Sequence, residues 1–194
     1  MKDNTGRWSH WSAPVQFVAG EPLAQATPVD LRITELMYNP PAPPAGDPTD
    51  KDDFEFVELQ NVGAETLDLS SVSFTEGIAF DFKDGAVTVL APGAFVLVVK
   101  NITAFESRYG SGLSHLIAGE YAGRLSNGGE KIVLIDFWEG TILEFEYSDD
   151  WYDETDGQGY SLTVKNPFGT NPGDWGARAT WQPGPNAGGS PGTQ

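Results

Sequence analysis

Two acid-rich segments hold the side chains best suited to bind a cation. The first, within residues 40–53, supplies Asp47, Asp50, Asp52 and Asp53, and the second supplies Asp149, Asp150, Asp153, Glu154 and Asp156. Ca²⁺ takes about six to eight oxygen ligands, chiefly from carboxylates and carbonyls. Neither segment has the spacing of an EF-hand loop, and the glycines that end the second are typical of a turn. We predict that no cofactor is required. If the chain binds Ca²⁺, the candidate ligands are the four aspartates of the first segment.

Three further acids, Glu35, Glu55 and Glu58, lie inside segments that otherwise have the composition of strands. One interpretation is a carboxylate cluster that performs acid–base chemistry or holds a cation. The interpretation that we favour is structural. In that case each acid caps the amides of a turn or faces solvent on one face of a sheet.

The motifs of common catalytic sites are missing from the sequence. His10 and His115 are the only histidines, and their unlike contexts give little support to a histidine metal site or a Ser–His–acid triad. Neither G-x-S-x-G nor H-E-x-x-H occurs, and there is no phosphate-binding glycine loop. We therefore expect no catalytic residues and no enzyme activity. A metal-dependent hydrolase that uses the acid-rich segments is the least favoured alternative.

Aromatic side chains are the other candidates for binding. Trp138, Trp151, Tyr152 and Tyr160 could form a stacking platform for a sugar or a peptide. More often such residues belong to the core of a sandwich or cover one end of it, and we favour that interpretation. The ligand-binding candidates are Trp138, Trp151 and Tyr152.

Composition excludes several classes of protein. The net charge is −17, from 28 acids against 11 bases, so the chain would repel a nucleic acid, and we expect no nucleic-acid partner. There is no run of about 18 apolar residues, so we expect no membrane insertion. Cysteine is absent, which excludes disulfides and thiolate metal sites. The first residues, MKDNTGRWSHWS, lack the apolar core of a signal peptide.

Candidate strands must position these side chains. Alternating apolar residues and turn signals predict about nine short strands, and hence an all-β sandwich. The predicted strands are Leu31–Tyr38, Phe54–Gln60, Val72–Thr75, Ala79–Phe82, Ala86–Leu90, Phe95–Lys100, Lys131–Asp136, Thr141–Tyr147 and Gly159–Val164. The run that begins at Phe95 is apolar on both faces, so we expect a fully covered central strand.

Only one helix is predicted, Thr103–Tyr109. Thr103 and Glu106 have the spacing of a capping box, Phe105 and Tyr109 share a face, and Gly110 is placed to end the helix.

The chain divides into three parts by composition. Residues 1–28 contain Trp8–Ser12 (WSHWS) and Val15–Val18, which resemble the last strand of a fibronectin type III module, followed by a linker at 20–28. Residues 29–165 form the predicted sandwich. Residues 166–194 are rich in Gly and Pro, and we expect this extension to add no core layer, although Trp175 and Trp181 could pin it to the surface.

Six short motifs along 29–164 resemble, in their order, those of the lamin tail domain in bacterial proteins. They are ITELMYNP (Ile33–Pro40), EFVELQNVG (Glu55–Gly63), DLSSV (Asp68–Val72), LAPG (Leu90–Gly93), LSNGGE (Leu125–Glu130) and a Trp151…Asp156–Leu162 segment. Ser71 and Val72 stand where the family pattern has Gly-Trp, which changes a turn and one core anchor. The resemblance implies an immunoglobulin-like β-sandwich with one short helix.

The same resemblance implies a function. Such domains are non-catalytic binding or structural modules of larger extracellular or cell-surface bacterial proteins. We therefore expect loops at the sandwich ends to meet a protein, glycan or matrix partner, beside neighbouring domains of the same parent chain. The alternative is an accessory domain that positions an adjacent catalytic domain of nuclease, phosphatase or spore-coat-kinase type.

Overall fold

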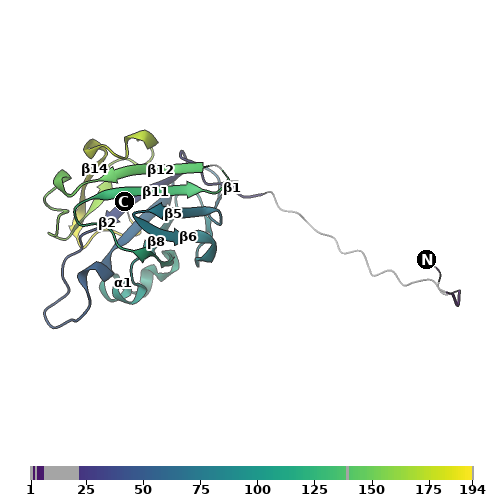
Figure 1. Cartoon of the computed structure of the whole chain (residues 1–194), viewed down its shortest axis with the longest axis horizontal. Helices are drawn as coiled ribbons and strands as arrows, with labels where there is room; N and C mark the ends of the chain where they lie inside the picture. The colour runs from purple at the N-terminus through teal and green to yellow at the C-terminus, as the bar shows by residue number, and fades with distance from the viewer. Residues whose placement is uncertain (1, 3, 7–21, 139, 194) are drawn as a thin grey trace.

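The computed structural model describes residues 2, 4–6, 22–138 and 140–193. The predicted fibronectin-like remnant at Trp8–Val18, together with His10, lies outside these residues. Two large sheets face each other across a common core, and a helix covers the outer face of one of them (Figure 1). The all-β sandwich with one short helix is therefore confirmed. Within the described part of the chain, no helix is long and apolar enough to cross a membrane.

The larger sheet has six strands in the order β14-β13-β2-β3-β8-β9. All neighbours are antiparallel except β8 and β9, which are parallel. The strands are β2 (Leu31–Met37), β3 (Phe56–Asn61), β8 (Phe95–Val99), β9 (Ile117–Glu120), β13 (Tyr160–Val164) and β14 (Trp181–Ala187). Every residue of β2 and β3 is buried, because the sheet is covered on both faces there.

The second sheet has five antiparallel strands in the order β10-β6-β5-β11-β12. They are β5 (Val72–Glu76), β6 (Ile78–Asp81), β10 (Ala122–Gly123), β11 (Glu130–Asp136) and β12 (Gly140–Tyr147). A small third sheet joins β1 (Ala24–Gln25), β4 (Leu67–Asp68) and β7 (Val89–Leu90). In β12 the apolar Leu143, Phe145 and Tyr147 are buried and Glu144 and Glu146 are exposed, as the alternation predicts.

Two apolar clusters hold these layers together. The main core fills the space between the large sheets, and a second cluster lies between the outer face of the six-stranded sheet and the helix α1 (Ile102–Tyr109). Phe105 and Tyr109 of α1 both pack edge-on against Phe56 of β3. The strand β8 contributes to both clusters, which confirms the fully covered strand predicted from its composition.

The N-cap of the helix lies two residues before the predicted capping residue, Thr103. Asn101 is the N-cap, and its Oδ1 accepts a hydrogen bond from the Ala104 amide at 3.0 Å. Glu106 instead accepts a hydrogen bond from the Ser114 hydroxyl, so the predicted pairing with Thr103 is wrong. Gly110 ends the helix with φ 80°, as expected.

Short 3₁₀ turns make up the remaining regular structure. They are η1 (Lys51–Phe54), η2 (Phe82–Asp84), η3 (Ser111–Leu116), η4 (Asp149–Trp151), η5 (Pro172–Asp174) and η6 (Arg178–Thr180). The predicted strand Ala86–Leu90 is shorter than expected, since only Val89 and Leu90 pair in a ladder, while the Ala86 amide donates to the Ala118 carbonyl at 2.7 Å.

The C-terminal segment is part of the folded core, contrary to the expectation from its composition. Strand β14 pairs with β13 and forms the edge of the six-stranded sheet. The side chains of Trp175 and Trp181 are fully buried in the main core, and the Trp175 indole donates to the Ile33 carbonyl at 2.9 Å. The sequence did not predict this packing, because the Gly- and Pro-rich segment has no alternation of apolar and polar residues.

The predicted linker at 20–28 also contributes to the fold. Ala24 and Gln25 form β1 and pair with β4 in parallel, and Ala26 is buried in the main core. The packed structure therefore starts several residues before the predicted boundary at residue 29.

Candidate functional site

Glu35 and Glu58 form a buried pair on the outer face of the six-stranded sheet. They stand opposite each other on β2 and β3, and their side chains are at most 1% exposed. Glu35 accepts from the Ser190 amide at 2.8 Å and from its hydroxyl at 3.1 Å. Glu58 accepts from the Thr34 hydroxyl at 2.7 Å and from the Gly192 amide at 2.6 Å. The turn that follows β14 is thus held on the sheet by two carboxyl groups.

Glu55, directly before β3, is also buried. Its Oε2 accepts from the Tyr121 hydroxyl at 2.7 Å and from the Leu125 amide at 2.9 Å. Burial raises the pKa of Glu55 to about 7, although these two hydrogen bonds act in the opposite direction. The carboxyl group therefore anchors the segment that leads into the hairpin of β11 and β12.

The favoured interpretation of these three acids is half right. Each caps one backbone amide, as expected for a structural role, but none faces solvent. Their burial follows from segments distant in sequence that fold over the sheet. Glu35 and Glu58 lie together, whereas Glu55 has its own partners, so the three do not form one cluster.

The first acid-rich segment projects beside α1 (Figure 1). Asp47, Asp50 and Asp53 line a hollow of about 460 Å³ there, whereas Asp52 is paired with Arg124 at 3.4 Å. Asp47 accepts from the Thr49 amide and hydroxyl, and Asp50 accepts from the Asp52 amide, so both have local roles.

The second acid-rich segment lies at the same end of the sandwich. The Asn39 amide nitrogen donates to Asp156 at 2.9 Å, and Lys51 donates to the Asn39 oxygen at 2.6 Å, so an amide and an ammonium group stand between the two segments. Among the described residues, no three acids, histidines or cysteines gather as a metal ion would require. Ca²⁺ binding at Asp47, Asp50, Asp52 and Asp53 stays a prediction.

Trp151 and Tyr152 contact the C-terminal segment of the chain. The Trp151 ring lies 6.5 Å from that of Trp181. The Tyr152 hydroxyl donates to the Trp181 carbonyl at 2.8 Å, and the Arg178 guanidinium lies 4.7 Å from its ring centre. Both residues are only partly exposed, and their contacts join the turn after β12 to the base of β14.

Trp138 stands apart from these residues, beyond the opposite end of β12. It follows Phe137 in the turn between β11 and β12, and both side chains are 73% exposed. The two rings meet edge to face, with centroids 4.8 Å apart and planes at 90°. Such a pair of exposed large aromatics is a candidate contact surface.

Buried Asp136 orders this aromatic turn. Its Oδ1 accepts from the Trp138 amide at 2.8 Å, and its Oδ2 accepts from the Ser71 hydroxyl at 2.5 Å. The Phe137 amide donates to the Ser71 carbonyl at 2.9 Å. The backbone that carries both rings is therefore fixed against the start of β5.

A hollow of about 240 Å³ opens beside the two rings. We call it the hairpin hollow, and its lining residues are Ser70, Ser71, Ser73, Asp81, Lys83, Phe137 and Trp138. The register brings these residues together, because Ser73 of β5 pairs with Asp81 of β6 on one side and with Ile135 of β11 on the other. Lys83 donates to Asp81, and this bond lowers the pKa of the aspartate.

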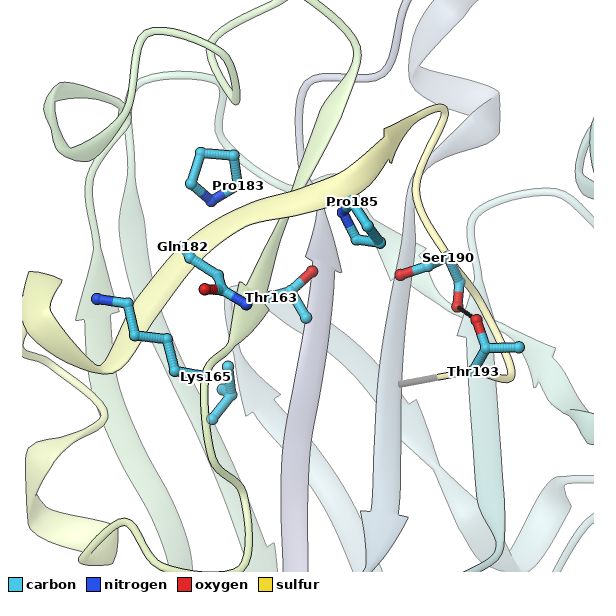
Figure 2. Close-up of a pocket in the computed structure, with 8 residues that line it drawn as sticks. Thr163, Lys165, Gln182, Pro183, Pro185, Ser190 and Thr193 are labelled. Atoms are coloured by element: carbon cyan, nitrogen blue, oxygen red, sulfur yellow. Dashed lines mark hydrogen bonds between the residues drawn. The ribbon is translucent and has the colours of Figure 1, made fainter.

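A second hollow lies at the C-terminal edge of the six-stranded sheet (Figure 2). It has a volume of about 370 Å³ and lies between β13, β14 and the turn that carries Ser190 and Thr193. Figure 2 shows two prolines, Pro183 and Pro185, along β14 and the bond that Thr193 donates to the Ser190 carbonyl. Among the described residues that line it, Lys165 has the one charged side chain and none is aromatic.

The sequence interpretation named Trp138 but missed the residues around it. Phe137 carried a usable signal, since two consecutive large aromatics cannot both point into the core from a strand of period two. Ser73, Asp81 and Lys83 carried none, because only the register of β5 and β6 places them beside the turn.

One comparison with known proteins gives a match. A family model described as Lamin Tail Domain matches residues 24–149. The matched region includes the hairpin hollow and the buried acids, whereas β13, β14 and the residues that cap Glu35 and Glu58 follow it. No curated protein and no solved structure matches the chain.

Proposed function

The chain belongs to the lamin tail domain family, and on that premise we propose that it is a non-catalytic binding module. It would serve a larger extracellular or cell-surface bacterial protein and present the turn between β11 and β12 to a protein or glycan partner. The observation that carries this proposal is the ordered, exposed pair Phe137 and Trp138 beside the hairpin hollow. Burying two such rings against a partner supplies a large part of a binding energy.

The fixed backbone of Phe137 and Trp138 favours this use. The hydrogen bonds from Ser71 and Trp138 to Asp136 hold the backbone before any partner arrives, so less conformational entropy is lost on binding. The buried acids, in contrast, lie under protein segments where a substrate has no access, which favours a structural role for them.

Array binding with matched variants tests the proposal. The chain is applied to protein and glycan arrays as the native sequence and as Trp138→Ala, Phe137→Ala and Phe168→Ala. Phe168 is the control, because its side chain is 65% exposed but does not line the hairpin hollow. We expect the first two variants to lose about tenfold or more in affinity for a partner of the native chain. Equal binding by Trp138→Ala would overturn the proposal.

The alternatives make different predictions. An accessory domain would adjoin a catalytic domain in the full-length gene, which the gene sequence decides. A metal-dependent hydrolase would show activity in a screen with divalent metals and lose it on replacement of Asp52 and Asp53 by alanine. We expect no such activity. We also expect no binding to nucleic acid, because the net charge of −17 would repel its phosphates.

A further inference from the structure

We propose that the hairpin hollow is a carbohydrate site that takes one neutral pyranose unit of a glycan. This inference rests on the proposed function, which leaves the partner open between protein and glycan. Here the partner is a glycan, and the unit that binds is a neutral pyranose.

The two rings provide the apolar half of such a site. The ring planes of Phe137 and Trp138 are at 90° to each other, so the edge of one ring meets the face of the other. Both side chains are largely exposed. The face of an aromatic ring carries partial negative charge. One face of a pyranose is formed by C–H groups that carry partial positive charge, so the sugar can stack on an exposed ring.

Hydroxyl groups provide the polar half. Ser70, Ser71 and Ser73 line the hollow, and each hydroxyl can donate one hydrogen bond and accept two. The Ser71 hydroxyl donates to Asp136 and lies 3.1 Å from the Gln25 side-chain oxygen, and the Ser73 hydroxyl bonds to Asp81. Both hydroxyls keep a capacity to accept from a ligand. A polyhydroxylated ligand can donate to the free acceptor positions of these hydroxyls, whereas an apolar peptide side chain cannot use them.

Charge and size select a neutral unit. Among the described residues that line the hollow, Asp81 and Lys83 are the charged ones, and they are paired with each other, so these two side chains offer no unpaired charge to a ligand. The acidic chain as a whole would repel an anionic polymer. A volume of about 240 Å³ is below the roughly 300–1,000 Å³ of a drug-sized ligand pocket, which suits a single sugar ring.

The experiment titrates the whole chain with defined oligosaccharides. The probes are neutral hexasaccharides of cellulose, xylan, mannan and chitin, with hexagalacturonate as the acidic probe. Calorimetry measures affinity, and proton–nitrogen NMR follows the indole signal that disappears in Trp138→Ala. The variants are Trp138→Ala for stacking, Ser73→Ala for the hydroxyl groups, and Phe168→Ala as the exposed aromatic control. Thermal unfolding checks that each variant is folded.

We expect a neutral hexasaccharide to bind and to shift the Trp138 indole signal. Affinity should fall about tenfold or more in Trp138→Ala and about threefold or more in Ser73→Ala, and stay unchanged in Phe168→Ala. Binding that survives Trp138→Ala, or binding of hexagalacturonate alone, would overturn the inference. If no saccharide binds but a protein partner on the array depends on Trp138, the carbohydrate inference fails and the proposed function stands. If neither depends on Trp138, both fail.

Discussion

At the scale of single residues, the pair Glu35 and Glu58 is the most consequential feature. Burial raises the pKa of Glu35, and burial together with the neighbouring Glu35 carboxyl raises the pKa of Glu58 to about 8. Near neutral pH the pair therefore retains a proton, and the amides of Ser190 and Gly192 compensate for the remaining charge.

This pair predicts that stability falls as the pH rises. A carboxyl group whose folded-state pKa lies above its ordinary value of 4.5 stabilises the fold fully below about pH 4.5, and the contribution is lost as the pH rises through about 8. We expect the free energy of unfolding to decrease by about 2 kcal/mol or more between about pH 5 and about pH 8. Urea denaturation at several pH values measures it.

Glu58→Gln should reduce this decrease, because it removes one of the three buried carboxyl groups whose pKa is raised. The matched control is Glu146→Gln, the same substitution on the exposed side of β12. An unchanged pH dependence in Glu58→Gln would show that the pair does not titrate as the structure implies.

At the scale of elements, the start of α1 decides how the helix meets the sheet. The Asn101 cap satisfies the Ala104 amide and places Phe105 and Tyr109 over Phe56 of β3. The sequence analysis predicted Thr103 for this position, and the structure places Asn101 there.

Two alanine variants distinguish the caps. Asn101→Ala should lower the free energy of unfolding by about 1 kcal/mol, because an amide of the first turn loses its acceptor. Thr103→Ala should leave it within about 0.5 kcal/mol, since Thr103 makes no cap bond and alanine favours the helix. Chemical denaturation measures both. A larger loss in Thr103→Ala than in Asn101→Ala would restore the capping box predicted from the sequence.

At the scale of the whole molecule, the segment after residue 165 completes the fold. It supplies the edge strand β14, two fully buried tryptophans and the amides that cap Glu35 and Glu58. The Trp181 indole donates to the Trp175 carbonyl at 2.6 Å, so the two anchors also support each other. The family match ends at residue 149, before all of these contributions.

Truncation after residue 165 should therefore abolish cooperative thermal unfolding, measured by circular dichroism. A point variant tests the same idea in the full chain. Trp175→Ala should cost about 3–5 kcal/mol, because it removes a large core side chain, while the control Phe168→Ala from the same segment should cost less than about 0.5 kcal/mol. If the truncated chain unfolded cooperatively at the same midpoint temperature as the full chain, this account would be wrong.

Much of the sandwich could be predicted from the sequence alone. The alternation in β12, the apolar run in β8 and the turn residues between strands are local patterns, and they indicate where the strands lie and which of their faces are buried. Trp138 was a candidate because an aromatic ring can stack on a sugar or a peptide. The lamin tail motifs lie in this part of the chain.

Only the tertiary structure decided the rest. Trp175 and Trp181 lie in a segment without periodicity, and they are buried because that segment pairs with β13 and reaches the main core. The hairpin hollow depends on strand register, which places Asp81 beside Ser73. Local sequence determines the elements, whereas long-range packing determines which elements meet, because it depends on surfaces that exist only after the sheets have formed.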